Sequence, residues 1–213
     1  MTIRVFLADD HAVVRYGLRY LLETQGDIAV IGVASNGREA VQQAQRLHPD
    51  VMVVDVAMPE LNGIEAIRQI RETAPSTRIV VLSIYSTVEH VHRALQAGAL
   101  GYVLKESAGA EVVEAVRVAH AGQEYLSRKI VEAGIYDAIQ WRHSQSPLDS
   151  LSPREREVLQ LIVEGKSSAE TADLLSLSPK TVETYRSRLM HKLGIHDLPG
   201  LVKFAVQHGL TPP

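Results

Sequence analysis

The chain has 213 residues, of which 46% are hydrophobic and 22% are charged, and it contains no cysteine. This length leaves room for two modest domains, and the apolar content excludes wholesale disorder. The absence of cysteine excludes disulfides and thiolate metal sites. The sequence has no signal peptide and no apolar run near the roughly 20 residues that span a bilayer, so we expect a soluble, cytoplasmic protein without membrane partners.

The net charge of −3 is unevenly distributed along the chain. Residues 1–150 hold 14 Lys and Arg against 18 Asp and Glu, whereas residues 151–213 hold 8 against 7. Since neither part is strongly basic, any contact with nucleic acid must come from a local basic patch.

The first 121 residues alternate short apolar runs with segments of helical periodicity. Strands are predicted at residues 3–8, 28–33, 51–54, 79–83 and 101–105. Helices are predicted at residues 11–23, 37–47, 63–72, 88–97 and 110–121. Strands that are apolar throughout are typical of a parallel sheet covered by helices on both faces. We therefore predict an α/β fold, a (βα)₅ doubly wound parallel sheet with the flavodoxin-like strand order.

Acidic residues follow two strands that this order makes neighbours. Asp9 and Asp10 come after the first strand, and Asp55 comes after the third. The carboxyl ends of these strands face one crevice, so three carboxylates are expected to converge. Two unit charges about 4 Å apart repel by roughly 4 kcal/mol at an effective dielectric of about 20, and such a cluster needs a cation. Oxygen ligands at this edge favour Mg²⁺ over zinc.

Two further polar residues reach the same edge of the sheet. Ser83 ends the fourth strand, and Lys105 ends the fifth. A hydroxyl, an ammonium group and a divalent cation around one carboxylate form a phosphoryl-binding site in which Asp55 is the nucleophile. Taken singly, each residue has an ordinary alternative, because an Asp after a strand is often a helix N-cap and a Lys is usually solvated. The four together favour the phosphoryl site.

The motifs at these strand ends share the pattern of a known family. They are Asp9-Asp10-His11, Asp55 with Met58-Pro59 and Gly63, Ser83, and Gly101-Tyr102-Val103-Leu104-Lys105. Residues 3 to about 121 resemble the receiver domain of bacterial response regulators. The resemblance implies that Asp55 accepts a phosphoryl group from a phosphohistidine on a sensor histidine kinase.

The resemblance also implies a metal site and a switch. Mg²⁺ would be held by Asp10, Asp55 and the backbone carbonyl of Ala57, with Asp9 helping through water. Ser83 would move toward the phosphoryl group, and Tyr102 would turn inward behind it. The alternative for Tyr102 is a packed aromatic residue without a switching role.

Two positions depart from the usual receiver pattern. Many receivers have Thr where Ser83 stands, and many have Pro where Glu106 follows Lys105. Because cis peptide bonds are costly without proline, a cis bond after Lys105 is not expected.

Residues 123–147 are predicted to be a partly helical linker between domains at 1–122 and 148–213. Residues 123–141 are amphipathic and end in Trp141, which we interpret as a packing residue. The stretch RHSQSPLD at 142–149 is polar and shows no periodicity.

The last part of the chain carries signals for an all-α domain of four helices. Helix starts are predicted at Ser152-Pro153 with Glu155, at Ser167 with Glu170, at Ser178-Pro179 and at Asp197. The corresponding stops are Gly165, Leu175, Gly194 and Gly209. Because only Ser176-Leu177-Ser178 separates the second and third helices, the pair is typical of a helix-turn-helix motif.

The third helix of this domain combines an inward apolar stripe with a basic outer face. Val182, Leu189 and Leu193 recur at spacings of seven and four residues and face inward. The outer residues predicted to contact DNA are Lys180, Thr181, Glu183, Thr184, Tyr185, Ser187, Arg188 and Lys192. The alternative, from charge spacing alone, is an ordinary solvated helix face.

Sequence motifs favour the DNA-binding interpretation. Residues 151–159 (LSPREREVL), Glu164-Gly165-Lys166, residues 178–182 and residues 192–195 resemble the LuxR-type DNA-binding domain. That family often has His where Tyr185 stands, and a Tyr hydroxyl can still reach a phosphate. Glu183 departs from a purely basic surface, and we expect it to contact a cytosine amino group or to shape selectivity.

The whole chain therefore resembles the NarL/FixJ-type (LuxR-type) response regulators. The resemblance implies a transcription regulator, not an enzyme, in which phosphorylation of Asp55 promotes homodimerisation or releases the C-terminal helices. The dimer would bind double-stranded promoter DNA at half-sites about 34 Å apart.

Three other functions compete with this interpretation. A phosphatase or phosphotransferase of the haloacid-dehalogenase type needs a second acid two residues after its nucleophile, where this chain has Ala57. A nucleotide-binding module would carry a Gly-rich loop in place of Asp9-Asp10-His11. A receiver-like module regulated by partner binding instead of phosphorylation remains the main alternative.

Overall fold

The computed structural model describes residues 2–135 and 146–211. The chain divides into two compact units, residues 1–142 and residues 143–213. Trp141 and residues 142–145 of the polar stretch lie outside the described residues, so the predictions made for them stay predictions.

A parallel sheet in the order β2-β1-β3-β4-β5-β6 forms the centre of the first unit. The strands are β1 (Ile3–Ala8), β2 (Ile28–Ala34), β3 (Val51–Asp55), β4 (Arg78–Ser83), β5 (Gly101–Leu104) and β6 (Tyr125–Leu126). The first five strands confirm the predicted (βα)₅ fold and its flavodoxin-like order. β6, which pairs with the outer edge of β5, was not predicted.

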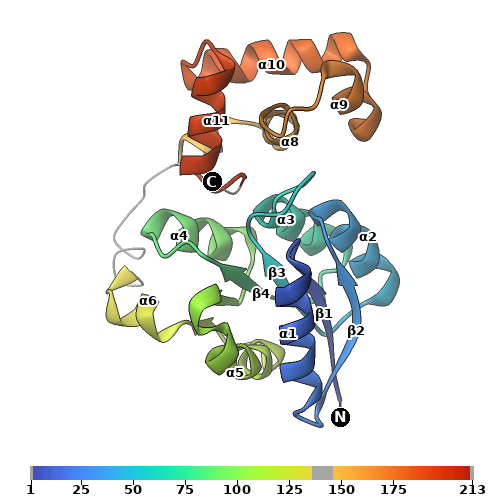
Figure 1. The fold of residues 1–213 in the computed structure, drawn as a ribbon, viewed down its shortest axis with the longest axis vertical. Coiled ribbons are helices and arrows are strands. Elements are labelled where there is room, and N and C mark those ends of the chain that lie inside the picture. The colour runs from blue at the N-terminus through green and yellow to red at the C-terminus, as the bar shows by residue number, and fades with distance from the viewer. Residues whose placement is uncertain (1, 136–145, 212–213) are drawn as a thin grey trace. The chain divides into compact units, whose positions relative to one another are not determined.

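Helices cover both faces of this sheet (Figure 1). The helices are α1 (Ala12–Glu23), α2 (Gly37–Leu47), α3 (Gly63–Thr73), α4 (Val88–Ala97) and α5 (Ala108–His120). α1 and α5 share one hydrophobic cluster with the sheet, and α2, α3 and α4 share the other. In β3, Val51 and Val53 belong to the first cluster, and Met52 and Val54 belong to the second. Both faces of β3 are therefore apolar, as expected for a central parallel strand.

The segment after α5 belongs to the first unit, although we predicted a linker from residue 123. It contains β6 and the short helix α6 (Arg128–Glu132), so the expected partial helix is present. Ile130 is fully buried in the cluster on the α2, α3 and α4 side. A two-residue strand is too short to give a periodic signal in sequence, and pairing with β5 is what makes it a strand.

The second unit consists of helices, as predicted. They are the 3₁₀ turn η2 (Pro147–Ser150) and helices α8 (Pro153–Val163), α9 (Ser168–Leu175), α10 (Pro179–Leu193) and α11 (Leu198–Gln207). Capping boxes begin α8 and α9, at Ser152 with Glu155 and at Ser167 with Glu170. Caps of this kind contribute about 1 kcal/mol each to helix stability. The turn between α9 and α10 completes the helix-turn-helix arrangement.

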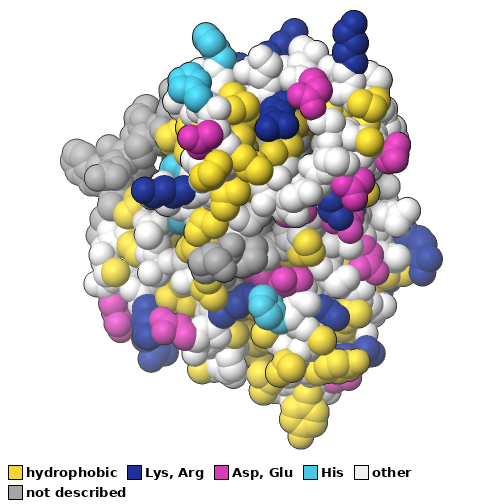
Figure 2. All heavy atoms as spheres, turned by 45° about the horizontal axis from the view of Figure 1, so that its top comes forward, with side chains coloured by type: hydrophobic (Ala, Val, Ile, Leu, Met, Phe, Trp, Pro, Cys, Tyr) yellow, Lys and Arg dark blue, Asp and Glu magenta, His cyan; other side chains and the backbone are white. Residues whose placement is uncertain are grey.

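The surface carries charges of both signs. Figure 2 shows acidic and basic side chains interspersed over the face that it presents, which agrees with the small net charge of −3. Within residues 2–135 and 146–211, no helix is long and apolar enough to cross a membrane.

Candidate functional site

The carboxyl ends of β1, β3 and β5 bring three charged side chains together. Asp9 and Asp55 are both almost fully buried. Lys105 places its Nζ 2.9 Å from Oδ2 of Asp9 and 2.8 Å from Oδ2 of Asp55, where it donates a hydrogen bond. Asp9 and Asp55 are 46 positions apart along the chain, and Asp55 and Lys105 are 50 apart, so the parallel sheet explains their meeting.

Asp10 and His11 extend this acidic pocket toward solvent. Nδ1 of His11 lies 2.7 Å from Oδ1 of Asp10, whose side chain is 26% exposed. Potential ligand atoms of Asp9, Asp10, His11 and Asp55 all lie within 4.8 Å of one another. Neither Oδ2 of Asp9 nor Oδ1 of Asp10 accepts a well-formed hydrogen bond from the described residues, although both atoms are buried. Carboxylate oxygens gathered this closely are ligands that a hard cation prefers, so this pocket can hold a metal ion.

None of these three acids is a helix cap, which was the ordinary alternative for them. The N-cap of α1 is His11, whose side chain makes no capping bond. The N-cap of α3 is Asn62, whose side chain accepts a hydrogen bond from the backbone N–H of Glu65. None of the three carboxylates caps α1 or α3, although Oδ1 of Asp9 accepts a hydrogen bond of 2.8 Å from the backbone N–H of His11.

Burial raises the pKa of Asp55 from 3.8 to about 6. The Lys105 ammonium opposes this increase, and the carboxylate of Asp9 adds to it. For Lys105, burial lowers the pKa, but the carboxylates of Asp55 and Asp9 outweigh burial, and the pKa of the lysine rises. Above pH 6 the pocket thus contains an ionised Asp55 beside a charged Lys105.

Gly63 is required by a close approach to the backbone of Asp55. A Cβ atom at this position would lie 2.0 Å from the carbonyl oxygen of Asp55. The backbone N–H of Gly63 donates to the carbonyl oxygen of Val56 at 2.8 Å. The glycine of the Asp55 motif therefore lets α3 begin directly against the end of β3.

Ser83 and Tyr102 are linked through the backbone of Tyr85. Oγ of Ser83 accepts a hydrogen bond of 3.0 Å from the N–H of Tyr85. The hydroxyl of Tyr102 donates to the carbonyl oxygen of Tyr85 at 2.7 Å. Both Ser83 and Tyr102 are fully buried, and burial raises the pKa of the Tyr102 hydroxyl. Tyr102 thus occupies the inward position, and its movement stays a prediction.

His90 is part of this arrangement and was missed from sequence. Its ring stacks on Tyr85, with centroids 4.3 Å apart and an angle of 8° between the planes. Nδ1 of His90 lies 2.7 Å from Oγ1 of Thr87. A histidine on an amphipathic helix gives no signal of such a contact in the sequence. The peptide bond after Lys105 is trans, as expected, since the described residues contain no cis peptide.

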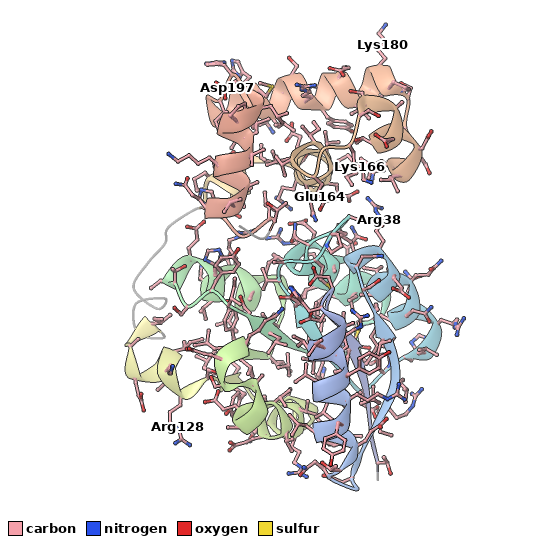
Figure 3. All side chains as sticks on the ribbon, viewed as in Figure 1. Arg38, Arg128, Glu164, Lys166, Lys180 and Asp197 are labelled. Carbon is pink, nitrogen blue, oxygen red and sulfur yellow. The ribbon has the colours of Figure 1, made fainter. Side chains whose placement is uncertain are left out.

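The outer face of α10 gathers most of the residues predicted to contact DNA. One hollow of the second unit is lined by Ser178, Lys180, Thr181, Thr184, Tyr185 and Arg188. Lys180 points away from the rest of its unit (Figure 3). Val182 and Leu189 are fully buried on the opposite side of the helix, as predicted. Ser178 was not among the predicted DNA contacts, because the sequence assigned it a role as the N-cap of α10. Its Oγ does accept a hydrogen bond from the backbone N–H of Thr181.

Glu183 and Lys192 are bonded to residues of the second unit that lie outside α10. Nζ of Lys192 donates to Oε2 of Glu155 at 2.7 Å and to the carbonyl oxygen of Ser150 at 3.1 Å. Glu183 accepts a hydrogen bond from the hydroxyl of Ser168 on α9. Ser187 is exposed on the same helix. Glu183 and Lys192 therefore differ from the residues that line the hollow, because their side chains already have partners on other segments.

Comparison with known families divides the chain in the same way. The family model for the response regulator receiver domain matches residues 5–117. The family model for bacterial regulatory proteins of the luxR family matches residues 149–205.

Curated relatives match along nearly the whole chain. The response regulator UvrY of Escherichia coli strain K12 is 38% identical over 208 residues, which cover 98% of this chain and 95% of UvrY. The response regulator GacA of Pseudomonas viridiflava is 38% identical over 209 residues, which cover 98% of each chain.

A solved structure of similar organisation is RcsB from Salmonella enterica serovar Typhimurium, bound to promoter P1flhDC in the presence of the phosphomimetic BeF₃⁻. It is 26% identical, the match covers 100% of both chains, and the TM-score is 0.63. From the two family matches, the relatives and the fold, the chain belongs to the NarL/FixJ-type two-component response regulators, transcription regulators that join a receiver domain to a LuxR-type DNA-binding domain.

Proposed function

We propose that Asp55 is the phosphoacceptor of this protein and that its phosphorylation controls the binding of promoter DNA. The observation that carries the proposal is the buried Asp55 carboxylate, hydrogen-bonded at 2.8 Å by Lys105 and flanked by Asp9. The receiver domain, predicted at 1–122 and extended here by β6 and α6, and the DNA-binding domain, predicted at 148–213, would divide these tasks.

Asp55 would act as a nucleophile toward a phosphohistidine of a sensor histidine kinase. A carboxylate oxygen of Asp55 attacks phosphorus, the P–N bond breaks as the new P–O bond forms, and the imidazole leaves with the electron pair of the broken bond. With a pKa of about 6, the carboxylate is mostly ionised at neutral pH. Lys105 and Ser83, at the ends of neighbouring strands, would donate hydrogen bonds to the phosphoryl oxygens.

Mg²⁺ is the cation that best fits the pocket. Asp10, Asp55 and the carbonyl oxygen of Ala57 would hold it, and Asp9 would contribute through water. The close grouping of the Asp9, Asp10 and Asp55 carboxylates supports this set. The ion would offset negative charge on the phosphoryl oxygens.

Ser83 and Tyr102 would carry the switch, since both are hydrogen-bonded to the backbone of Tyr85. A shift of Ser83 toward a phosphoryl group would pull on this backbone and change the environment of Tyr102. The inward Tyr102 would then be stabilised behind the β4–α4 connection.

The second unit would place α10 in the major groove of promoter DNA. Lys180, Thr181, Thr184, Tyr185 and Arg188 would make the first contacts, because they line one hollow of this surface. Ser187 is available beside them, whereas Glu183 and Lys192 would first have to exchange their present partners. A homodimer formed on phosphorylation would present two such helices to half-sites about 34 Å apart.

The proposed partners also indicate where and how the protein acts. Promoter DNA and a kinase phosphohistidine imply action in the cytoplasm. The second residue after Asp55 is Ala57, so a side-chain acid for turnover of free substrates is missing at that position, and we expect no enzymatic role.

The direct test is phosphorylation by a small acyl phosphate in the presence of Mg²⁺, followed by intact mass measurement. Wild type and Asp27→Ala should gain one alkali-sensitive phosphoryl group, and Asp55→Ala should gain none. Asp27 is a matched control because it directly precedes β2 and therefore lies at the amino ends of the strands, whereas Asp55 lies at their carboxyl ends. No gain in wild type would contradict the proposal and favour a module regulated by partner binding.

DNA shift assays test the second half of the proposal. We expect tighter binding of promoter fragments after phosphorylation, and equal affinity with and without the donor would contradict the switch but not DNA binding itself.

A further inference from the structure

The outer edge of β5 is covered by the segment that leads toward the second unit. Gly101 and Tyr102 of β5 pair with Tyr125 and Leu126 of β6. The backbone N–H of Ser127 then donates to the carbonyl oxygen of Tyr102 at 2.8 Å. The strand that carries Tyr102, and that ends just before Lys105, is therefore hydrogen-bonded directly to this segment.

Ser127 makes a contact that its position in α6 does not explain. It is the N-cap residue of α6, yet its side chain makes no capping bond. Its Oγ instead accepts a hydrogen bond of 3.0 Å from the N–H of Leu104 and donates to the carboxylate of Glu111 on α5. Ser127 is fully buried. A serine at an N-cap normally bonds to its own helix, so this hydroxyl serves the end of β5.

Two other contacts attach α6 to the same region. Ile130 is buried in the hydrophobic cluster that contains Tyr102 and Leu104. Glu111 also accepts a hydrogen bond of 3.3 Å from the backbone N–H of Arg128. The Arg128 side chain itself points away from the unit, so only its backbone takes part (Figure 3).

We propose that Ser127 is a positioning residue that joins the end of β5, with Tyr102 and Lys105, to residues 125–132, and thereby transmits a change at Asp55 toward the DNA-binding unit. This inference rests on the proposed function. A buried N–H is rarely left without an acceptor, so a shift of β5 at Leu104 must either carry Ser127 with it or leave the N–H of Leu104 unbonded. The segment therefore follows the strand.

The coupling can be measured with BeF₃⁻ and Mg²⁺, a reversible stand-in for the phosphoryl group. The quantity is the ratio of DNA dissociation constants without and with BeF₃⁻, for a duplex selected by the wild-type protein from a random library. Ser127→Ala should reduce this ratio about fivefold or more, toward 1, while BeF₃⁻ still binds. By reciprocity, DNA should raise the affinity for BeF₃⁻ in wild type and lose this effect in the variant.

Two further variants make the test specific. Ser107→Ala is a matched control, because Oγ of Ser107 is buried and has no hydrogen-bond partner among the described residues. It should keep the wild-type ratio. Glu111→Ala removes the acceptor on α5 but leaves the bond between Leu104 and Ser127, and it should give an intermediate ratio. Because Glu111 is only partly buried on a helix, this variant also decides the question if Ser127→Ala does not fold.

The outcomes separate this inference from the proposed function. Failure of wild type to bind BeF₃⁻, or binding without a change in DNA affinity, contradicts the proposed function and removes the basis of the coupling. Binding of BeF₃⁻ together with a full wild-type ratio in Ser127→Ala, or in Glu111→Ala where the serine variant is unfolded, overturns the role of Ser127 alone.

Discussion

The two charged regions of this protein are built in opposite ways. The pocket around Asp55 draws Asp9, Asp55 and Lys105 from three strand ends and buries them within ion-pairing distance. The face of α10 takes Lys180, Thr184 and Arg188 from one helix, at spacings of four residues, and leaves them exposed.

This difference decides what each region can do. In the buried pocket, charges interact strongly and their protonation is altered, which suits chemistry at one carboxylate. On the exposed helix, each cation is screened and acts nearly independently, which suits a salt-dependent contact with a polyanion. Changes in the pocket should therefore be large and coupled, and changes on α10 should be small and additive.

The largest effect on stability is expected where an added side chain is forced against the backbone of Asp55. Gly63→Ala places a Cβ 2.0 Å from a backbone oxygen and should lower the free energy of unfolding by about 3 kcal/mol. Gly109→Ala, in α5 with open space around it, should raise it by roughly 0.5 kcal/mol. Urea denaturation measures both, and equal stability of the two variants would show that α3 can withdraw from β3.

The next effect tests whether burial of charge destabilises the pocket. Because the pKa of Asp55 rises from 3.8 to about 6 on folding, the folded state binds more protons than the unfolded state between these values, and stability falls as pH rises through them. In protein without Mg²⁺, Asp55→Asn should be more stable than wild type by on the order of 2 kcal/mol at pH 7.5 and by less at pH 5.

Asp27→Asn provides a control of opposite sign. Its hydrogen bond with Arg117 lowers the pKa of Asp27, so the stability that this carboxylate contributes is present above its unfolded pKa and is lost as pH falls. The variant should be slightly less stable than wild type at pH 7.5. A stability gain of Asp55→Asn that is equal at both pH values would contradict the buried-charge explanation.

A smaller effect distinguishes a structural lysine from a lysine proposed to contact DNA on the same helix. Lys192→Ala removes the bonds to Glu155 and Ser150 and should lower the free energy of unfolding by roughly 1 kcal/mol. Lys180→Ala, at an exposed position, should change it by less than about 0.5 kcal/mol. If Lys192→Ala is as stable as wild type, the bonds of Lys192 to Glu155 and Ser150 do not stabilise the fold, and its side chain is free to contact DNA as predicted.

The smallest effect concerns the salt dependence of DNA binding. Arg188→Ala should weaken binding several-fold and lower the slope of log K against log salt by about 1, because one phosphate contact is lost. Lys203→Ala, on α11, should leave the slope unchanged. Equal slopes for wild type and Arg188→Ala would mean that this arginine does not contact a phosphate.

Much of the fold and of the candidate site followed from short-range patterns in the sequence. Apolar runs and helical spacing predicted five strands and their helices, because the period of two or 3.6 residues is set by local backbone geometry. Once the strand order was known, acids after the first and third strands and Lys105 after the fifth had to share one edge. The starts of α8 and α9 followed from capping residues three positions apart, and the start of α10 followed from Ser178-Pro179.

Other features were decided only by the tertiary structure. β6 exists because Tyr125 and Leu126 meet the free edge of β5, and Ser127 bonds to Leu104 and Glu111 instead of its own helix. Likewise, Lys192 on α10 bonds to Glu155 on α8. The sequence alone explained Glu155 as part of a capping box and Lys192 as part of a basic surface, and so it did not predict their contact. The sequence by itself determined the elements and the strand-end chemistry, since these depend on neighbours a few residues away. The tertiary structure decided which hydroxyl, ring or ammonium group meets which partner, because those pairs are separated by up to tens of residues and depend on packing.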